Sequence, residues 1–594
     1  MTGSRLPNGG RIERSASIRF MFDGKNYSGH PGDTLASALL ANGVTLFARS
    51  FKYHRPRGVF AAGSDEPNAL VTVLSGEVRE PNVRATELEI HDGLVTVSQN
   101  RYPSLEHDFM AVNQLAGPLL SAGFYYKTFM GPAIGPLRST RLWMVCEKFI
   151  RRAAGLGKAG IAPDPDRYER MNAFCDVLVV GSGPAGLIAA EAAAATGARV
   201  IIAEDKPLAG GSLLASGELI DGRNPAVWAR EKAEALAALP NVRFLVRTCV
   251  WGYYDGNVLT AVERVADHRT GRTLGEPRQR HWIIRTGKTI LATGAFERPI
   301  VFPGNDCPGV MLADAVRRYA VEYGVATGNN VTVFTNNDSA YDAVRTLTIA
   351  GVNVVAIIDA RADISGTCRD IADIAGAELL LGHAVTATHA GKSLSSVTVQ
   401  HFNAETGRIS GAPRDIRTDC LGVSGGWSPA IHLASQAGGR PEWDEDLQAF
   451  LPPEPGQNWV ATGAAAGYMD TISVLSDAAT KGSVKSRLVL PPVDAPMLDS
   501  SPAPVFQIEP AAKSQKAFVD FQHDVTADDI RLAYREGFHS VEHLKRYTTL
   551  GMATDQGKTS NVPGLAIMAD IRGISIPEAG TTRFRPPFSP ISMG

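Results

Sequence analysis

The sequence predicts an α/β protein whose body is a reductase-like, two-dinucleotide-binding Rossmann fold. An N-terminal β-grasp (ferredoxin-like) domain and a small C-terminal helical domain are expected on either side of that body. Three observations predict this class. A strand–GxGxxG–helix unit begins near residue 174, a second strand–helix–strand pattern covers about 329–361, and a strand–hairpin–strand–helix pattern opens the chain.

Composition limits the kinds of partner. The 594 residues are 44% hydrophobic and 20% charged, with a formal net charge of -2, as expected of an ordinary globular protein. That charge gives no reason to expect nucleic acid or an anionic membrane as a partner. No apolar run reaches the ~20 residues of a membrane helix, and the N-terminus lacks a secretory signal. Six dispersed cysteines without a CxxC motif argue against zinc or cysteine-ligated clusters and favour a cytoplasmic protein.

The N-terminal pattern predicts a β-grasp domain over 1–105. Two short strands are expected within 17–30, followed by a helix that begins after Asp33 as its N-cap. A cluster-binding version of this fold would place several cysteines in the next loop, which here has none. We therefore predict the domain without an iron–sulfur cluster, followed by a connecting arm over 106–172.

That cysteine-free loop carries a dense basic segment, RSFKYHRPRG. It could meet a cofactor phosphate or an acidic partner surface, or it could be a solvated basic loop. The sequence leaves both interpretations open. The basic residues are Arg49, Lys52, His54, Arg55 and Arg57.

The central body, predicted over 173–490, opens with VLVVGSGPAGLIAA. Gly181, Gly183 and Gly186 form GxGxxG between a strand and a helix. In this motif the first glycine makes the turn, the second lets a pyrophosphate approach, and the third lets helix and strand pack closely. Full strand and helix context makes this a strong prediction of a dinucleotide site.

The next predicted strand ends in Glu204 and Asp205. A carboxylate at this spacing accepts hydrogen bonds from an adenosine ribose and repels a 2′-phosphate, so NADP is disfavoured.

The second strand–helix–strand pattern lacks the glycines. VFTNNDSAY places Thr335, Asn337 and Ala340 where the first unit has its three glycines, and side chains there would crowd a pyrophosphate. We predict that this unit is structural.

A third feature selects the dinucleotide. In FAD-binding reductases the late turn of the body usually reads Gly-Asp, whereas here Ala464 follows Gly463. The first unit is therefore predicted to hold NAD rather than FAD. The predicted cofactor-binding residues of the body are Gly181, Gly183, Pro184, Ala185, Gly186, Glu204, Asp205, Lys206, Gly211, Ser212, Val250, Thr293, Gly294, Arg298 and Gly463.

Residues 505–594 follow a proline-rich linker and predict a small helical domain with Thr526 as an N-cap. His539 and His543 lie four residues apart on an expected helix, but HSVEH is not HExxH, so we predict a surface pair and no metal. No GxSxG elbow is present, and no catalytic residue is assigned.

Several segments together resemble one family, the alpha subunits of heterotetrameric sarcosine oxidase. The resemblance covers essentially the whole chain. It rests on RSFKYHRPRGVF (49–60), SDEPNALV (64–71), EPNVRAT (80–86), AGFYYKTFM (122–130), ATGAFERPIVF (292–302), VFTNNDSAY (333–341) and KRYTTLGMATDQGKTSN (545–561).

The resemblance implies an NAD bound by this chain, an FAD on the beta subunit where sarcosine is oxidised, and an FMN at the alpha–beta boundary where oxygen becomes peroxide. It implies beta, gamma and delta partner subunits and a small amine substrate. Thr548, Thr549 and Lys558 of the last motif are expected to face that FMN. The family's alpha subunit normally continues into a folate-binding domain about where this sequence stops, so we expect these residues not to bind tetrahydrofolate.

Two other functions remain open at this point. One is a self-sufficient FAD-dependent amine or opine dehydrogenase, with FAD in the Gly181 turn. The other is a non-catalytic assembly subunit without any flavin contact.

Overall fold

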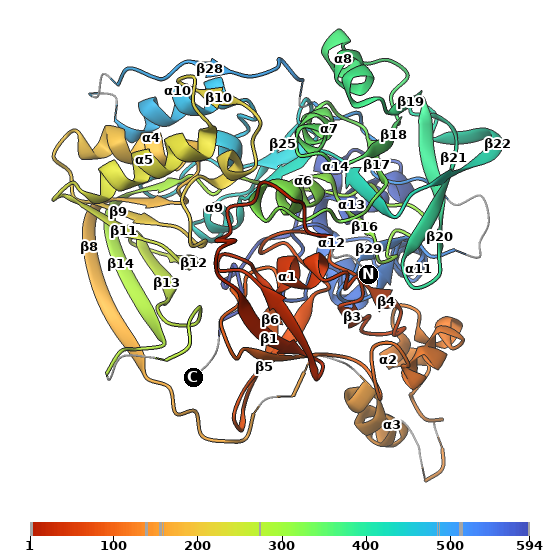
Figure 1. Cartoon of the computed structure of the whole chain (residues 1–594). Helices are drawn as coiled ribbons and strands as arrows, with labels where there is room; N and C mark the ends of the chain where they lie inside the picture. Colours follow the sequence, from red (N-terminus) through yellow and green to blue (C-terminus); the bar gives the residue numbers. More distant parts are fainter. Residues whose placement is uncertain are drawn as a thin grey trace.

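The computed structural model describes residues 4–132, 134–136, 140–153, 157–158, 160–271, 275–483, 485, 488–499, 501–509 and 515–591. The chain builds a β-grasp domain, a two-unit Rossmann body and a C-terminal helical domain, which are coloured red, yellow to cyan and blue in Figure 1. The predicted fold class is confirmed.

The N-terminal sheet has the order β2-β1-β7-β5-β6. The hairpin expected within 17–30 is present, but Thr34 rather than Asp33 caps the following helix, through a capping box with Ser37. The buried Asp33 carboxylate instead accepts hydrogen bonds from Arg5 and Ser37. The elements are β1 (Ile18–Phe22), β2 (Lys25–Gly29), α1 (Leu35–Ala41), β3 (Ala48–Arg49), β4 (Pro56–Arg57), β5 (Leu70–Ser75), β6 (Val78–Arg84) and β7 (Val95–Ser98).

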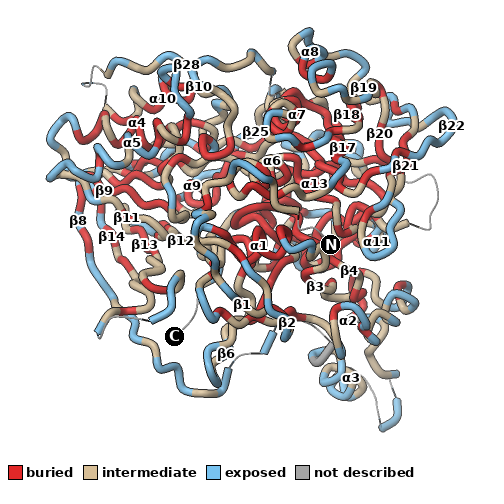
Figure 2. The backbone as a smooth tube through the Cα atoms, viewed as in Figure 1, coloured by how far each residue is buried: buried red, intermediate tan, exposed pale blue. Residues whose placement is uncertain are grey.

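The connecting arm predicted over 106–172 follows the N-terminal domain, and few of its described residues are buried. Its helices are α2 (Phe124–Lys127) and α3 (Thr140–Ala153), and the arm hangs below the body in Figure 1. Figure 2 shows the described part of α3 without buried residues, in contrast to the helices of the body.

The first Rossmann unit is a sheet of order β11-β9-β8-β14-β13-β12, with β27 also paired to β14. Strands β9, β8, β14 and β27 run parallel and end at one edge. Helices α4, α5 and α10 lie side by side over one face (Figure 1). The elements are β8 (Tyr168–Val180), α4 (Pro184–Ala194), β9 (Val200–Ala203), β10 (Leu219–Ile220), α5 (Pro225–Ala237), β11 (Val242–Leu245), β12 (Thr248–Tyr254), β13 (Val258–Arg264), β14 (Gln279–Leu291), β27 (Trp459–Ala461), α10 (Thr471–Gly482) and β28 (Val493–Asp494).

The second unit is inserted between β14 and β27 and forms a parallel sheet of order β16-β23-β17-β18-β19. The short pair β15–β24 connects the two units, and a three-stranded sheet, β20-β21-β22, lies at the outer side. The elements are β15 (Ala295–Glu297), β16 (Val310–Leu312), α6 (Ala313–Glu322), β17 (Val331–Thr335), α7 (Ser339–Ile349), β18 (Val354–Asp359), α8 (Gly366–Ala375), β19 (Glu378–Leu381), β20 (His383–Ala390), β21 (Leu394–Asn403), β22 (Arg408–Arg417), β23 (Cys420–Ser424), β24 (Trp427–Pro429), α9 (His432–Gln436), β25 (Glu442–Asp444) and β26 (Ala449–Leu451).

The C-terminal domain is a small helical cluster behind the second unit. Thr526 caps α11 through a capping box with Asp529, as the sequence predicts for the cap. Its elements are β29 (Phe518–Asp520), β30 (Val525–Thr526), α11 (Ala527–Arg535), α12 (Val541–Thr548), α13 (Asn561–Arg572) and α14 (Ile576–Ala579). No helix among the described residues has the length and apolar character to cross a membrane.

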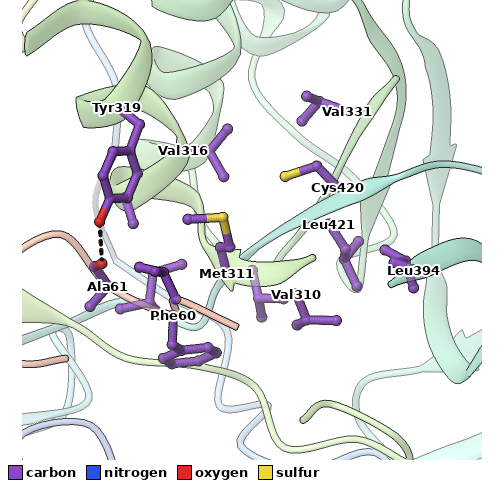
Figure 3. Close-up of a cluster of buried hydrophobic side chains, with 14 of the residues drawn as sticks. Phe60, Ala61, Val310, Met311, Val316, Tyr319, Val331, Leu394, Cys420 and Leu421 are labelled. Carbon is purple, nitrogen blue, oxygen red and sulfur yellow. Dashed lines mark hydrogen bonds between the residues drawn. The ribbon is translucent and has the colours of Figure 1, made fainter. Parts of the chain in front are cut away.

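One continuous core joins the N-terminal domain to the second unit. Phe60 and Ala61 pack among Met311, Val316 and Tyr319 in this core, as Figure 3 shows. The Phe60 carbonyl accepts from the Leu312 amide at 2.8 Å, and the Ala61 carbonyl accepts from the Tyr319 hydroxyl at 3.2 Å. The residues after Ala61 are thereby fixed against the body.

Candidate nucleotide-binding site

The three glycines of the first turn are explained by different physical needs. Gly181 has φ +97°, and a Cβ there would lie 2.4 Å from the Ala292 carbonyl oxygen. A Cβ on Gly186 would lie 2.0 Å from the Gly181 oxygen. Both are required by the turn and by the packing of α4 against β8, whatever is bound.

Gly183 is different, because no described protein atom requires it to be glycine. Its φ of -67° and ψ of -173° are ordinary extended values. A Cβ there would have only the Gly211 Cα, at 3.8 Å, as a near neighbour. The missing side chain leaves free space in front of the N-terminus of α4, where Gly183 is the N-cap and supplies no side-chain hydrogen bond to the helix. Such a helix end attracts a phosphate, through free amide groups and the helix dipole.

Glu204 lies at the end of β9, beside this turn. Its Oε2 accepts from the Ser182 amide at 2.8 Å and the Ser182 hydroxyl at 2.6 Å, and its Oε1 accepts from the Lys206 amide at 3.0 Å. Burial first, and then the neighbouring Asp205, raises the pKa of Glu204 to about 7. Oε2 has both lone pairs occupied, whereas Oε1 can still accept a further bond, as a ribose hydroxyl would require.

A cavity of about 970 Å³ lies in front of the turn, near the upper end of the usual range for ligand sites. It is lined by the first unit, by the second unit and by 61–65 of the N-terminal domain. Its position outside the carboxyl ends of parallel strands is where open α/β sheets bind ligands.

Most of the predicted body residues line this cavity. They are Gly181, Gly183, Pro184, Ala185, Glu204, Asp205, Lys206, Gly211, Ser212, Val250, Thr293 and Gly294.

Three predicted body residues lie outside the lining. Gly186 serves the packing of α4 on β8. Arg298 is buried and donates to the carbonyl oxygens of Gly425 and Trp427, so its guanidinium serves the junction of the two units. Gly463 is buried beside Ala185.

The second unit fills the corresponding space with protein. The Asn337 side chain, fully buried, stands where Gly183 stands in the first unit. Its Oδ1 accepts from the Ser339 amide at 3.1 Å, and its Nδ2 donates to the Ser424 hydroxyl at 3.1 Å. The helix amide that would meet a phosphate is therefore already bonded.

The acidic end of the second unit is also occupied. Asp359 ends β18, as Glu204 ends β9, but Arg361 donates to both of its carboxylate oxygens, at 3.0 and 2.8 Å. The Tyr341 hydroxyl donates to the same group at 2.9 Å. Both features are typical of a structural unit rather than a second dinucleotide site.

The late turn has Ala464 where the Gly-Asp pattern has its aspartate, and a different carboxylate, that of Asp477, lies close to this turn. Ala464 lines the cavity without a polar side chain. Asp477, within α10, accepts from the Thr462 hydroxyl at 2.6 Å and from the Gly463 amide at 3.3 Å. This carboxylate therefore holds the turn itself and is bonded to protein rather than aimed at a ribitol.

The basic segment of the N-terminal domain is neither a phosphate site nor a solvated loop. Arg57 is buried and ion-paired with Asp306 and Asp524, and Arg55 pairs with Asp306 at 2.5 Å. His54 bonds to Asp108 at 2.7 Å. Both interpretations from sequence are wrong, because the acidic partners come from distant parts of the same chain. The segment ties the N-terminal domain to the body and the C-terminal domain.

The C-terminal residues expected at a flavin are not part of the cavity lining, although Lys558 packs 4.2 Å from the centroid of the Phe588 ring, which lines it. Thr548 is buried and donates to Leu544, and Thr549 closes α12 with φ +68°. Lys558 is buried and donates to the carbonyl oxygens of Asp555 and Phe588, and burial lowers its pKa to about 8.

The histidine pair does not share a helix. His539 precedes the N-cap Ser540, and only His543 lies in α12. Within the described ranges, no three His, Cys, Asp or Glu side chains lie together as a metal site.

Sequence reasoning missed several wall residues. His432 on α9 and Phe588 in the C-terminal tail line the cavity, as do Asp65 and Arg318. No motif marks these residues, because distant segments bring them to the cavity.

Comparisons with known proteins agree with this arrangement. Residues 175–446 match the family described as pyridine nucleotide-disulphide oxidoreductase, and 514–594 match the sarcosine oxidase A3 domain. Residues 15–101 match the 2Fe-2S iron-sulfur cluster binding domain. The first cysteine of the chain is Cys146, so the matched range contains no thiolate to ligate a cluster.

Two relatives are similar over the whole chain. The sarcosine oxidase alpha chain of Rhizobium meliloti (strain 1021) is 48% identical over 100% of this chain, and that of Corynebacterium sp. (strain P-1) is 38% identical over 100%. The chain spans 59% and 58% of the lengths of these two proteins. One chain of the opine oxidase of Agrobacterium tumefaciens (strain Ach5) is 25% identical over 71% of this chain and 91% of its own length.

Among solved structures, the L-proline dehydrogenase of P. horikoshii has the same fold. It superposes with a TM-score of 0.67 over 99% of both chains, at 17% identity.

Proposed function

The chain belongs to the family of sarcosine oxidase alpha subunits, and from this premise we propose that it is the NAD-holding subunit of a multi-subunit sarcosine oxidase. The complex demethylates sarcosine oxidatively to glycine and reduces oxygen to hydrogen peroxide. Sarcosine is oxidised at an FAD on the beta subunit, so no residue of this chain is assigned to that step.

One observation carries the proposal that this chain holds a dinucleotide. Gly183 has ordinary backbone angles and open space where its side chain would be, so neither strain nor packing accounts for the glycine. A pyrophosphate in that space does account for it.

The walls favour NAD among the adenine dinucleotides. Glu204 and Asp205 would repel the 2′-phosphate of NADP. Ala464 supplies no carboxylate for a flavin ribitol, and Asp477 behind it is bonded to the turn. When bound, NAD would contribute a nicotinamide ring and stabilise the folded chain by mass action.

A second cofactor is proposed at the boundary with the beta subunit. The family likeness supports a contribution of Thr548, Thr549 and Lys558 to an FMN site there. Replacing Lys558 by Met in the assembled complex should lower FMN content and leave NAD content unchanged. Unchanged FMN would favour a purely structural role for this segment.

The arm supports partner subunits, which we propose to be beta, gamma and delta. It concentrates exposed apolar side chains, including Phe109 at 70%, Leu115 at 84% and Phe149 at 68% exposure. Apolar surface of this kind marks sites of protein association.

The test uses the assembled complex and the chain alone. We expect the complex to form hydrogen peroxide from sarcosine and to oxidise opines poorly or not at all, and we expect the isolated chain not to reduce a dye with sarcosine. Dye reduction by the isolated chain would instead make it a self-sufficient dehydrogenase. Activity on opines but not on sarcosine would contradict the proposed substrate.

A further inference from the structure

The loop of the N-terminal domain that reaches the cavity has the spacing of an iron–sulfur loop. Plant-type [2Fe–2S] proteins place cysteines in the pattern C-x4-C-x2-C. In this chain the same spacing joins Ala61, Glu66 and Ala69, within the range 15–101 that matches the cluster-binding family. None of these residues can be a thiolate ligand, so another group must organise the loop.

That group is the fully buried carboxylate of Glu66. Its Oε2 accepts from the amides of Phe60 at 2.8 Å and Ala61 at 2.7 Å. Its Oε1 accepts from the amides of Asn68 at 2.6 Å and Ala69 at 2.9 Å. These bonds fix the backbone on both sides of Glu66, so the residues just before it take up a defined position on the cavity wall.

Gly63, in the middle of this wall, leaves space beside two charged side chains. Its φ lies outside the left-handed region, so the backbone does not require a glycine. A Cβ there would lie 3.2 Å from Asp65 Oδ1 and 3.4 Å from Arg318 Nη1, and no other described atom beyond its chain neighbours lies within 4 Å. All three residues line the cavity. As at Gly183, neither strain nor packing accounts for the glycine.

The Asp65 carboxylate is buried without a partner. The residue is 9% exposed, and no other described residue donates a hydrogen bond to the carboxylate or forms an ion pair with it. Both oxygens nevertheless keep accessible surface on the cavity wall. Burial raises the pKa of Asp65 above its usual range, and the charge of Arg318 offsets this only in part. Because an unpaired buried carboxylate is costly, a bond to a molecule in the cavity would account for it.

Arg318, on α6, supplies the opposite chemistry. Its Nε donates to Glu322 at 2.7 Å, whereas no described residue accepts from its other two guanidinium nitrogens. It forms no ion pair with Asp65 within the described ranges, so the two side chains present an acceptor and donors side by side. A neutral group that both donates and accepts hydrogen bonds fits this pair, whereas Asp65 would repel a phosphate.

We propose that Gly63, Asp65 and Arg318 form a recognition site for a neutral polar group of the bound dinucleotide, with Asp65 accepting a hydrogen bond from that group and Arg318 donating one to it. In NAD such groups are the ribose diols and the carboxamide of the nicotinamide ring. The inference rests on the proposed function in needing a dinucleotide in the cavity.

Asp65→Ala tests the carboxylate directly. After removal of bound nucleotide, calorimetry compares this variant with the wild-type chain for NAD, ADP-ribose and nicotinamide mononucleotide. We expect NAD to bind about tenfold more weakly, because a hydrogen bond to a charged group is lost. An equal loss for ADP-ribose alone places Asp65 at the adenosine ribose, a loss for nicotinamide mononucleotide alone places it at the carboxamide, and a loss for both places it at the nicotinamide ribose.

The stability of the unliganded chain separates recognition from a structural role. Asp65→Ala should melt no lower than the wild type, because the variant removes a buried charge that lacks a partner. Gly63→Ala should also keep its stability, since the φ of this residue suits alanine. It should weaken NAD binding by about tenfold, because the methyl group occupies the space beside Asp65 and Arg318.

Glu77→Ala is the matched control. Glu77 is an exposed acidic residue of the same domain, between β5 and β6, and it is not part of the cavity lining. This variant should bind all three ligands as the wild type does.

Four results would overturn the inference. Equal NAD affinity in Asp65→Ala and the wild type would show that Asp65 makes no bond to the ligand. A lower melting temperature of the unliganded variant would show that protein groups hold the carboxylate. Sarcosine binding by the nucleotide-free chain that Asp65→Ala abolishes would assign the site to an amino acid, whose ammonium and carboxylate also fit the pair. If the wild-type chain binds none of the three nucleotides, the proposed function itself fails, and the inference fails with it.

Discussion

The two Rossmann units of this chain share one order of parallel strands, β11-β9-β8-β14 in the first and β19-β18-β17-β23 in the second, but they differ at the turn that would face a phosphate. In the first, Gly183 leaves the N-terminus of α4 open to the cavity. In the second, Asn337 fills the same position and bonds the Ser339 amide at the start of α7. Glu204 keeps acceptor capacity toward the cavity, whereas Asp359 is enclosed by Arg361 and Tyr341.

The difference teaches how a glycine should be interpreted. Gly181 and Gly186 would be needed in an empty protein, because side chains there collide with backbone. Of the three glycines, only Gly183 is explained by a bound pyrophosphate rather than by the backbone or by packing. A unit can therefore keep the strand, turn and helix of a nucleotide site and lose its function through one side chain that satisfies the helix end internally.

The largest effect is expected on the stability of the unliganded chain, from a glycine that is needed for packing rather than for binding. Gly186→Ala places a Cβ about 2.0 Å from the Gly181 oxygen. We expect unfolding to become easier by about 3 kcal/mol or more, because backbone atoms cannot yield as side chains do. Denaturant titration of the unliganded chain measures it.

The reciprocal change in the second unit, Ala340→Gly, should cost only about 1 kcal/mol, the helix propensity of the residue. Equal losses in the two variants would show that the close packing of α4 on β8 is not special.

The next largest effect is expected when Gly183 is replaced by asparagine, the residue found at the corresponding position of the second unit. Gly183→Asn should weaken NAD binding by about 100-fold, or about 2.7 kcal/mol, because a side chain occupies the phosphate space. The unliganded chain should keep its stability within about 0.5 kcal/mol, since asparagine is a good N-cap. Calorimetry and melting together measure both. Unchanged NAD affinity would remove the main support for the site.

Opening the second unit should cost stability without creating a site. Asn337→Gly leaves the Ser339 amide without its acceptor and removes the bond that Asn337 donates to the Ser424 hydroxyl, so we expect a loss of about 2 kcal/mol in unfolding free energy. Nucleotide content should not rise, because Asp359 remains bonded to Arg361. A second nucleotide per chain would show that Asn337 alone closes this unit.

The smallest effect depends on pH. The pKa of Glu204 is raised to about 7 in the folded chain, against about 4.5 when exposed, so folding binds a proton between these values. This contribution to stability is complete below about pH 4.5 and is lost as the pH rises through about 7.

NAD affinity should change in the opposite direction and rise toward about pH 7, because the ionised carboxylate is the better acceptor for ribose hydroxyls. Glu204→Gln should flatten both profiles between about pH 4.5 and 7 and weaken NAD by about tenfold. Unchanged profiles in the variant would assign the titration to another group.

Local patterns allowed much of the fold to be predicted. The strand, GxGxxG turn and helix at Gly181, the acid at Glu204 and the closed turn at Asn337 all depend on neighbours within a few residues or on a fixed spacing. The caps could also be predicted to within one residue, as Thr34 and Thr526 illustrate.

Contacts between distant segments could not be predicted. From the sequence, Arg57 is expected to contact a phosphate, an acidic partner surface or solvent. In the structure it pairs with Asp306 and Asp524, which are more than 200 residues away in the sequence. His432 and Phe588 carry no local signal; they reach the cavity because helix α9 and the C-terminal tail both pack against β12.

The central claim is that the first unit alone holds a dinucleotide and that this dinucleotide is NAD. Denaturing the purified chain and identifying the released nucleotide by mass and absorbance tests it most directly. We predict a colourless protein that releases one NAD per chain and no flavin. A yellow protein that releases FAD would contradict the inference from Ala464 and Asp477 and would place the redox chemistry on this chain.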